Sequence, residues 1–496
     1  MSRSLFVRLA ERFGPRERIL ARREFLRGAA IAAAGLAAGC TSSSPRKPLP
    51  PMSPLVPETT LGRVLIVGGG FAGLACAFEL LRAGADPIVL EPRNRVGGRV
   101  LSLNDRIPGK TIEAGGEFIG ANHPTWLGYA QRFGLALREA TEEDLDLPFV
   151  LGGESLTASE SEELYELLDM AVSPLTALAQ PIDPTRPWES PGARELDARS
   201  VGDWLTRSNM PNRVRHALGA MFAADNGVAI ERQNLLALLS MIKGGGLEDY
   251  WTQSEVYRCE GGNQLMAERL AEALGPTRVR LGVRVVMIDA THPQPTIRTE
   301  RGDLLQADAV VLAVPPSAWP GIELRLPLPA GFSPQMGLAI KHISLLDKPH
   351  WRTLGYSPDA FTDSDVSLTW HATDGQPGEH GYAMTAFSGG PAAERVLARP
   401  EGIRRERQRD DLEALYPGIG KATTSEMFID WPGDPLVRAG YSFPGLGEIF
   451  KYGPTLVNGL GRVQFAGEHC SYGFVGYMEG ALGSGVRVAH RLVGVS

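Results

Sequence analysis

Three glycines and one carboxylate near the start of the chain have the types and spacing that bind a dinucleotide. Gly68, Gly70 and Gly73 form a G-x-G-x-x-G run, and Glu91 follows 18 positions after the last of them. In such a run the first glycine permits a tight turn, the second lets the backbone approach a pyrophosphate, and the third lets a helix pack closely on a strand. The acid can accept hydrogen bonds from the adenosine ribose. The alternative interpretation is a glycine turn with a purely structural role.

A second glycine-rich stretch, GEHCSYGFVGYMEGAL, occupies residues 467–482 near the C-terminus. It combines its glycines with Glu468, Tyr477 and Glu479. Because glycine has no Cβ, a backbone rich in it can approach a bound group closely. The stretch therefore predicts backbone contact with a ligand, with an aromatic ring beside it.

The elements around the first motif are those of a strand–helix–strand unit. Residues 64–67 form an apolar run typical of a buried parallel strand, a helical pattern continues to Leu81, and residues 87–90 form a second apolar run. A helix that begins at the glycines presents free N–H groups and the positive end of its dipole to phosphates. The whole pattern predicts a dinucleotide-binding domain.

Composition excludes several other classes of protein. The chain has 496 residues and a formal net charge of −7, and its part after residue 39 carries 42 basic against 54 acidic residues. No basic stripe remains, so a nucleic-acid partner is not expected. The four cysteines form no CxxC pair, and the nine histidines have no metal-ligand spacing. Neither a disulfide framework nor a metal site is therefore expected.

The first 60 residues have the pattern of a targeting segment followed by a tether. Arg22 and Arg23 precede an apolar run at 28–39, which is too short to span a bilayer and fits a signal-peptide core. The arginine pair predicts twin-arginine export in residues 1–39, and the alternative is a chance pair in an ordinary secretion signal. LAAGC, ending at Cys40, is similar to a lipoprotein cleavage box, and the alternative is plain cleavage after a small residue. Residues 40–60 are predicted to be a tether.

Residues 91–99 and 112–120 carry a family resemblance. EPRNRVGGR and IEAGGEFIG resemble the glycine–arginine motif and the next segment of the FAD-dependent flavin monoamine oxidase family, which includes polyamine and L-amino-acid oxidases. The resemblance extends over most of residues 61–496. It implies that Arg99 meets the pyrophosphate as a charge-assisted donor. It also implies that the backbone at Gly116 and Glu117 approaches the flavin side of the cofactor.

Three further segments resemble the same family. Residues 257–274 match its Gly-Gly segment. The match of the following strands implies that the backbone of Val285 touches the adenine, and the side chain of Val285 also fits an ordinary core strand. MGLAIKHISLLDKPHW, at 336–351, places Lys341 near flavin N5. FIDWPGDPLVRAGYSFPG, at 428–445, places Trp431 near the flavin and Tyr441 beside its ring face.

The resemblance also addresses the C-terminal stretch and the link to the cofactor. Glu468 would bind the ribityl chain, and Met478 would begin a helix pointing at the flavin pyrimidine. Tyr477 would face Tyr441 across a substrate channel; the alternative is that both are core aromatics. Mammalian monoamine oxidases bond a cysteine to the flavin just before this tyrosine, and here Gly440 takes that place, so non-covalent FAD is expected. The predicted cofactor-binding residues are Gly68, Gly70, Ala72, Gly73, Glu91, Arg93, Gly98, Arg99, Gly116, Glu117, Val285, Trp431, Glu468, Tyr477 and Met478.

The order of the segments predicts an α/β fold in which a Rossmann-like FAD-binding domain of the glycine–arginine flavoprotein type is interleaved with a mixed-sheet and helical substrate domain. The FAD-binding pieces are predicted at 61–118, 252–333 and 430–496. The substrate-domain pieces are predicted at 119–251 and 334–429, and the first of these contains helical stretches that would cap the channel. The sequence leaves the oligomeric state open.

The predicted activity is oxidation of a primary or secondary amine to an imine. Lys341, Tyr441 and Tyr477 are the predicted catalytic residues, with O2 reduced to H2O2 and Lys341 acting through a water. No arginine follows Gly115-Gly116 to hold a carboxylate, which favours amines over amino acids. The alternatives are an L-amino-acid oxidase and an amine dehydrogenase that uses a periplasmic electron carrier. More distant are a carotenoid-type desaturase and a non-catalytic FAD lipoprotein.

Overall fold

The computed structural model describes residues 5–14, 61–141, 143–378 and 380–494. The predicted twin-arginine pair, Cys40 and the tether lie outside the described residues. None of the described helices is long and apolar enough to cross a bilayer. The first described segment, α1 (Leu5–Phe13), lies within the predicted leader, yet it packs on the rest of the chain. Phe6 is buried, with its ring 5.6 Å from that of Trp251.

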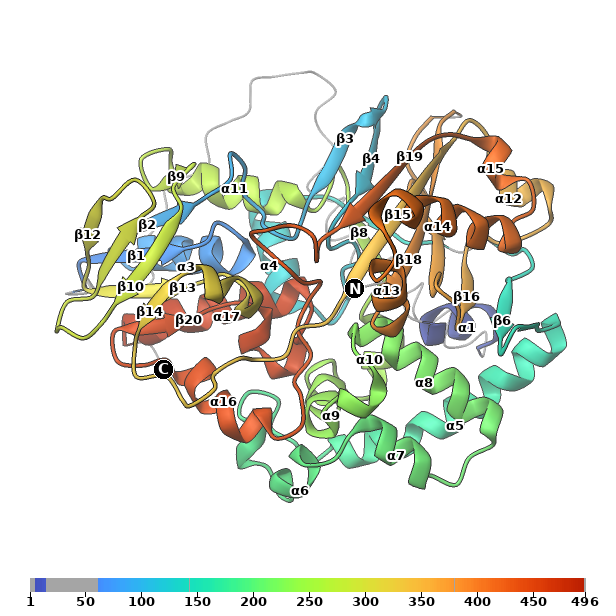
Figure 1. Ribbon diagram of the computed structural model, residues 1–496, viewed down its shortest axis with the longest axis horizontal. Helices are drawn as coiled ribbons and strands as arrows, with labels where there is room; N and C mark the ends of the chain where they lie inside the picture. The colour runs from blue at the N-terminus through green and yellow to red at the C-terminus, as the bar shows by residue number, and fades with distance from the viewer. Residues whose placement is uncertain (1–4, 15–60, 142, 379, 495–496) are drawn as a thin grey trace.

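A parallel sheet forms the centre of the cofactor side of the molecule (Figure 1). Its strands in spatial order are β20 (Val463–Phe465), β13 (Ala309–Leu312), β1 (Arg63–Val67), β2 (Asp86–Glu91) and β9 (Val279–Leu281). Both faces of β1 are buried, because successive side chains point to opposite sides of a strand and each side meets its own layer. Val64 and Ile66 pack in one hydrophobic cluster, and Leu65 and Val67 pack in another.

Helices cover the first face of this sheet. They are α3 (Phe71–Arg82), α4 (Pro124–Phe133), α11 (Gln264–Leu274) and α17 (Met478–Leu492). Glycines bring their backbones close together. A Cβ on Gly73 would lie 2.1 Å from the carbonyl oxygen of Gly68, and a Cβ on Gly485 of α17 would lie 2.2 Å from that of Ala72. The third glycine of the motif therefore serves helix packing, as its spacing predicts.

A second sheet and a helix cover the other face. The sheet has the order β12 (Leu304–Gln306), β11 (Thr296–Thr299), β10 (Val285–Asp289) and β14 (Glu323–Arg325). The helix is α16 (Glu448–Asn458), which contributes Tyr452 and Leu456 to the hydrophobic cluster under Leu65. The cofactor side thus has three layers, as expected for a buried parallel sheet.

The substrate side contains a mixed sheet. Its order is β19 (Thr423–Asp430), β15 (Ala339–Leu346), β18 (Tyr382–Gly389), β17 (Leu368–His371), β16 (Ala360–Thr362), β6 (Phe149–Leu151) and β7 (Glu154–Ser155). Strand β15 is buried almost throughout and pairs antiparallel with both β18 and β19. This central position fixes the direction of its side chains, including Lys341.

Helices complete the substrate side and lie below the mixed sheet in Figure 1. The longest, α5 (Ala158–Ala179), begins with a capping box in which Thr157 and Glu160 each bond the other's backbone N–H, and it confirms the predicted helical stretch. Those that follow are α6 (Ala193–Asp197), α7 (Val201–Arg207), α8 (Asn212–Asn226), α9 (Leu235–Gly244) and α10 (Glu248–Gln253). The helices α12 (His350–Thr353), α13 (Pro391–Leu397), α14 (Glu401–Leu415) and α15 (Ile419–Ala422) flank the mixed sheet.

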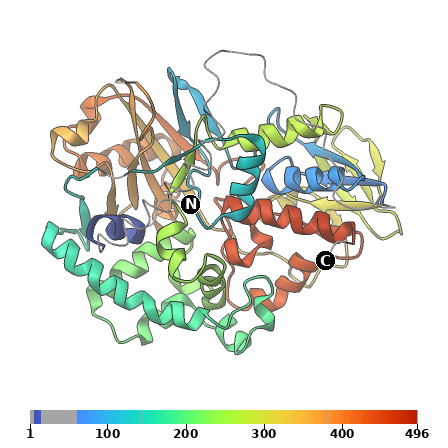
Figure 2. The same cartoon turned by 180° about the vertical axis from the view of Figure 1, so that it is seen from behind.

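The two sides are interleaved along the chain, which confirms the predicted fold class. The parallel sheet takes strands from three stretches separated by the substrate side, and the view from behind shows the same division (Figure 2). Two small ribbons connect the sides: β3 (Ser102–Ile107) with β4 (Lys110–Glu113), and β5 (Leu137–Glu139) with β8 (Tyr257–Cys259). The residue boundaries of the predicted pieces stay predictions.

Replacing Gly73 tests the close approach of α3 to β1. Gly73→Ala would press a methyl group on the Gly68 carbonyl, so we expect a loss of roughly 3 kcal/mol in the free energy of unfolding. The measurement is denaturant unfolding of the purified protein. Gly128→Ala in α4 is the matched control, because its Cβ meets nothing within 4 Å and should stabilise the helix by about 0.5–1 kcal/mol. Equal stability of Gly73→Ala and the wild type would contradict the packing.

Candidate active site

A large cavity lies at the carboxyl ends of the parallel strands, where open α/β sheets bind their ligands. Its empty space, counted together with the solvent at its open mouth, is about 1710 Å³. Its lining extends from the glycine loop at Gly68 and Gly70 to the rings of Tyr441 and Tyr477. The predicted residues that line it are Gly68, Gly70, Ala72, Glu91, Arg93, Gly98, Arg99, Gly116, Val285, Lys341, Trp431, Tyr441, Glu468, Tyr477 and Met478.

Two predicted cofactor-binding residues do not line the cavity. Gly73 lies one turn into α3, where its hydrogen faces the Gly68 carbonyl instead of a ligand. Glu117 is fully buried behind Lys341, and its carboxylate is bonded to protein groups. Gly73 therefore has the packing role that its spacing predicts. The approach of the Glu117 backbone to the cofactor stays a prediction.

The glycine loop leaves a hollow beside the start of α3. Gly68 has φ +112°, a backbone conformation that favours glycine, whereas Gly70 has an ordinary φ of −79°. A Cβ on Gly70 would meet nothing within 4 Å, so no protein atom explains the glycine. No side chain caps the helix here. Its free N–H groups face a hollow that a phosphate fits.

Glu91 and Arg93 are held at the edge of this hollow. The Glu91 carboxylate accepts hydrogen bonds from the backbone N–H of Gly69 at 2.8 Å and of Arg93 at 3.0 Å. Burial raises the pKa of Glu91, although these donors oppose the shift. Arg93 forms an ion pair with Asp434, with 2.6 Å between Nη2 and Oδ2. The sequence did not identify Asp434, because 341 positions separate it from its partner.

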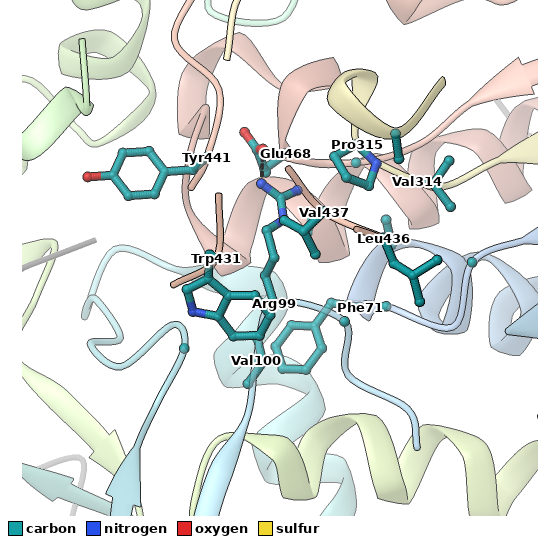
Figure 3. A pocket seen from close by; sticks show the side chains of 18 of the residues that line it. Phe71, Arg99, Val100, Val314, Pro315, Trp431, Leu436, Val437, Tyr441 and Glu468 are labelled. Atoms are coloured by element: carbon teal, nitrogen blue, oxygen red, sulfur yellow. Dashed lines mark hydrogen bonds and ion pairs between the residues drawn. The ribbon is translucent and has the colours of Figure 1, made fainter. Parts of the chain in front are cut away.

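A buried carboxylate, Glu468, connects separate segments of the cavity wall (Figure 3). It accepts hydrogen bonds from Arg99 Nη1 at 2.8 Å, from the backbone N–H and hydroxyl of Ser442, and from the Gly476 N–H at 2.8 Å. Burial alone would raise the pKa of Glu468, but Arg99 and the other donors hold it below its usual range. The carboxylate is therefore ionised at neutral pH. Ser442 is a residue that no sequence motif indicated.

Lys341 projects from β15 to the cavity wall and uses its ammonium within the protein. Its Nζ lies 3.0 Å from the Glu113 carbonyl oxygen, 2.9 Å from that of Gly115 and 2.9 Å from Glu117 Oε2. Glu117 in turn accepts hydrogen bonds from Arg258 Nε at 3.0 Å and Trp370 Nε1 at 2.9 Å. Burial would raise the pKa of Glu117, but Lys341 and Arg258 together lower it.

The side chain of Glu113 lies beside this network and titrates near neutrality. Burial raises its pKa to about 7, which the Asn263 N–H opposes and the charge of Glu117 reinforces. Its carboxylate accepts from the Asn263 N–H at 2.7 Å and from the Ser102 hydroxyl.

Tyr441 and Tyr477 line the cavity from different segments, and both are almost fully buried. The Tyr441 hydroxyl donates to the Ala224 carbonyl at 3.3 Å. The Tyr477 ring packs edge-on against His123, with 5.3 Å between centroids, and its hydroxyl shares a hydrogen bond with Tyr250. Burial raises the pKa of both cavity tyrosines well above the usual value, so both phenols stay neutral. That the two rings face each other across a substrate stays a prediction.

The position before Tyr441 has no room for a larger side chain. A Cβ on Gly440 would lie 2.7 Å from the Ala339 Cβ and 2.9 Å from its backbone nitrogen. The described cysteines, Cys76, Cys259 and Cys470, are buried, and none lines the cavity. Burial raises the pKa of Cys259 and Cys470 to about 12, which leaves both thiols protonated. In the described part of the chain no group of His, Cys, Asp and Glu could hold a metal ion.

Glu113→Gln should change how stability depends on pH. The folded-state pKa of Glu113, about 7, lies above the ordinary value of 4.5, so its contribution is full below about pH 4.5 and is lost as pH rises through 7. Gln keeps an acceptor for Asn263 without a titrating proton. We expect the variant to gain up to about 3 kcal/mol over the wild type between pH 5 and 8, measured by denaturant unfolding. Glu79→Gln, also buried, is the control. A wild-type decrease that persists in Glu113→Gln would contradict the assignment.

Comparison with known proteins identifies the family. Residues 71–493 match the family model of flavin containing amine oxidoreductases. The chain is 27% identical to a probable flavin-containing monoamine oxidase A of Dictyostelium discoideum, over 88% of this chain and 98% of that protein. It is also 27% identical to a putrescine oxidase of Kocuria rosea, over 88% and 96%.

Solved structures with the same fold support this result. A putrescine oxidase bound to putrescine superimposes with a TM-score of 0.78 at 24% identity and covers 88% of this chain and 99% of its own. A cyclohexylamine oxidase from Brevibacterium oxydans gives the same TM-score, identity and coverage. At this identity the likeness establishes the fold. Together with the family match over nearly the whole described core, it shows that the chain belongs to the flavin-containing amine oxidoreductases.

Proposed function

We propose that this protein is an amine oxidase that binds FAD without a covalent bond and oxidises a small primary or secondary amine to an imine. One observation carries the proposal. A single cavity extends from the glycine loop at Gly68 and Gly70 to the side chains of Lys341, Tyr441 and Tyr477. A phosphate-binding loop and an aromatic pocket that share one space can hold a dinucleotide with its reactive ring next to a substrate.

The residues of the cavity fit FAD. The hollow beside Gly70 and the start of α3 would take the pyrophosphate, with Arg99 nearby as a cation. Glu91 would receive the adenosine ribose, Val285 the adenine and Glu468 the ribityl chain. When bound, the flavin would accept the two electrons of the C–H bond that is broken at the carbon next to the amine nitrogen.

The packing of Gly440 supports non-covalent binding. A cysteine there would collide with Ala339, and the described cysteines lie away from the cavity. The lining of the cavity therefore offers no thiol to bond the cofactor among the described residues.

The protein's own part in the reaction is to position the amine and exclude water. Tyr441 and Tyr477 offer ring faces that suit an amine nitrogen and its alkyl arm. Their hydroxyls are bonded to Ala224 and Tyr250, which fixes the rings before substrate arrives. Such fixed walls stabilise a near-attack geometry. Relatives named for monoamines and for putrescine agree with an amine substrate.

The electron acceptor and the location of the protein are also proposals. O2, reduced to H2O2, is the proposed acceptor, with a periplasmic electron carrier as the alternative. Export by the twin-arginine signal, with a lipid at Cys40, would place the enzyme at the cell envelope. Fractionation of cells that make the whole chain tests this, and mature protein confined to the cytoplasm would contradict it.

Gly70→Val should produce a folded protein without colour. The new side chain would fill the hollow proposed for the pyrophosphate and collide with no protein atom near the Cβ. Wild-type protein should be yellow, and acid precipitation should release its FAD into the supernatant. Circular dichroism of both proteins provides the folding control. Flavin that stays with the precipitate would refute non-covalent binding, and a yellow Gly70→Val protein would refute the phosphate site.

Tyr477→Ala should slow reduction of the bound flavin by amine while the flavin remains bound. We expect a loss of about 1–3 kcal/mol of transition-state stabilisation, roughly 5–150-fold in rate. Tyr477→Phe keeps the ring face and should lose much less, which makes it the matched control. Anaerobic stopped-flow absorbance with an amine that releases peroxide from the wild type measures the rate. An unchanged rate in Tyr477→Ala would mean that the ring does not contact the substrate.

A further inference from the structure

The ammonium of Lys341 meets three acceptor oxygens of the protein. An ammonium carries three N–H donors and no acceptor, and a neutral amine carries two donors. Lys341 Nζ lies within 3.0 Å of three oxygens, two backbone carbonyls and Glu117 Oε2. The carbonyls can only accept. Glu117 is also an acceptor, because Lys341 and Arg258 lower the pKa of its carboxyl although burial would raise it. Three acceptors require three hydrogens. The geometry therefore fits a protonated lysine that the protein holds through three acceptors.

Glu117 is held as firmly as the lysine it binds. Its side chain is fully buried, and its second oxygen accepts from Arg258 Nε and Trp370 Nε1. Arg258 is fixed in turn, because it also donates to the His371 carbonyl and lies 3.5 Å from Asp374. Glu117 and Arg258 are buried and do not line the cavity, whereas Lys341, which Glu117 binds, does line it.

We propose that Glu117 is a positioning residue that clamps Lys341 as a fixed cation at the cavity wall, so that the lysine acts on the flavin by its charge and not by giving or taking a proton. The inference rests on the proposed function only in that a flavin occupies the cavity. A fixed positive charge favours a bound ring that gains negative charge on reduction.

A test of the clamp must separate the charge of Lys341 from the charges of the groups around it. The backbone carbonyl of Glu113 reaches it from the end of β4, and the carboxylate of Glu117 reaches it from the loop that follows β4. Arg258 lies behind Glu117. Its register partners in β18 and β19 are Phe387 and Ile429, which carry no charge. Every variant retains Glu113, so comparing the variants at the same pH removes the contribution of Glu113 to the flavin potential.

The experiment is an anaerobic redox titration of the flavin in the purified holoprotein, against dyes of known potential and without any amine. It compares the wild type, Glu117→Gln, Lys341→Met and the double variant between about pH 6 and 9, where a buried lysine without its carboxylate would titrate. In Glu117→Gln the midpoint potential of the flavin should show a pH-dependent step of ~30 mV. This step corresponds to a change of about tenfold in the two-electron equilibrium constant. The wild type and the double variant should lack this step. The midpoint potential of Lys341→Met should lie below that of the wild type at every pH.

Two controls make each outcome decisive. Glu79→Gln removes a buried, ion-paired carboxylate of α3 that does not line the cavity, and its potentials should follow the wild type. A Glu117→Gln protein that follows the wild type at every pH, or a step that persists in the double variant, would overturn the proposal. If Glu117→Gln loses its flavin, recovery of flavin in the double variant supports the clamp, and loss in both overturns it. A wild type that oxidises no amine would refute the proposed function and leave these potentials valid.

Discussion

The arrangement of the site depends on one buried carboxylate, that of Glu468. A buried charge is costly unless several donors compensate it, and Glu468 has them in Arg99, Ser442 and Gly476. Ser442 follows Tyr441 in the chain, and Gly476 precedes Tyr477. The need to satisfy this carboxylate therefore fixes both tyrosine-bearing segments and the arginine at the cofactor site in one geometry. Loss of the charge would remove a hydrogen-bond partner from each of them.

A second constraint joins the two sides of the molecule at the segment 113–117. Lys341 reaches from the mixed sheet to the carbonyls of Glu113 and Gly115, and Trp431 donates from Nε1 to that of Ala114 at 2.9 Å. Backbone that would otherwise leave unpaired carbonyls inside the protein is thereby satisfied by side chains from the substrate side. The cavity lies between two parts that cannot separate without exposing these groups, which suits a site that must keep water out.

Much of the cofactor half of the site could be predicted from the sequence, because its residues lie in local motifs. The conformation of Gly68, the packing of Gly73 and the start of α17 at Met478 follow from glycine spacing and helix signals. Partners far along the chain could not be predicted, since Asp434, Ser442 and Arg258 meet their partners only through the fold. Glu117 illustrates the limit best, because the motif indicated that its segment meets the cofactor but not that its side chain turns to Lys341. The packing of α1 on the rest of the chain could not be predicted either, because the composition of its segment indicates targeting.

The proposed function requires that one cavity holds a flavin and an amine within reacting distance. Anaerobic titration of the yellow protein with a single amine tests it most directly. The yellow colour should bleach in proportion to the added amine, with complete bleaching at one amine per flavin, and it should return when air is admitted. A protein that stays yellow with primary, secondary and diamine substrates, while dithionite still bleaches it, would contradict the claim.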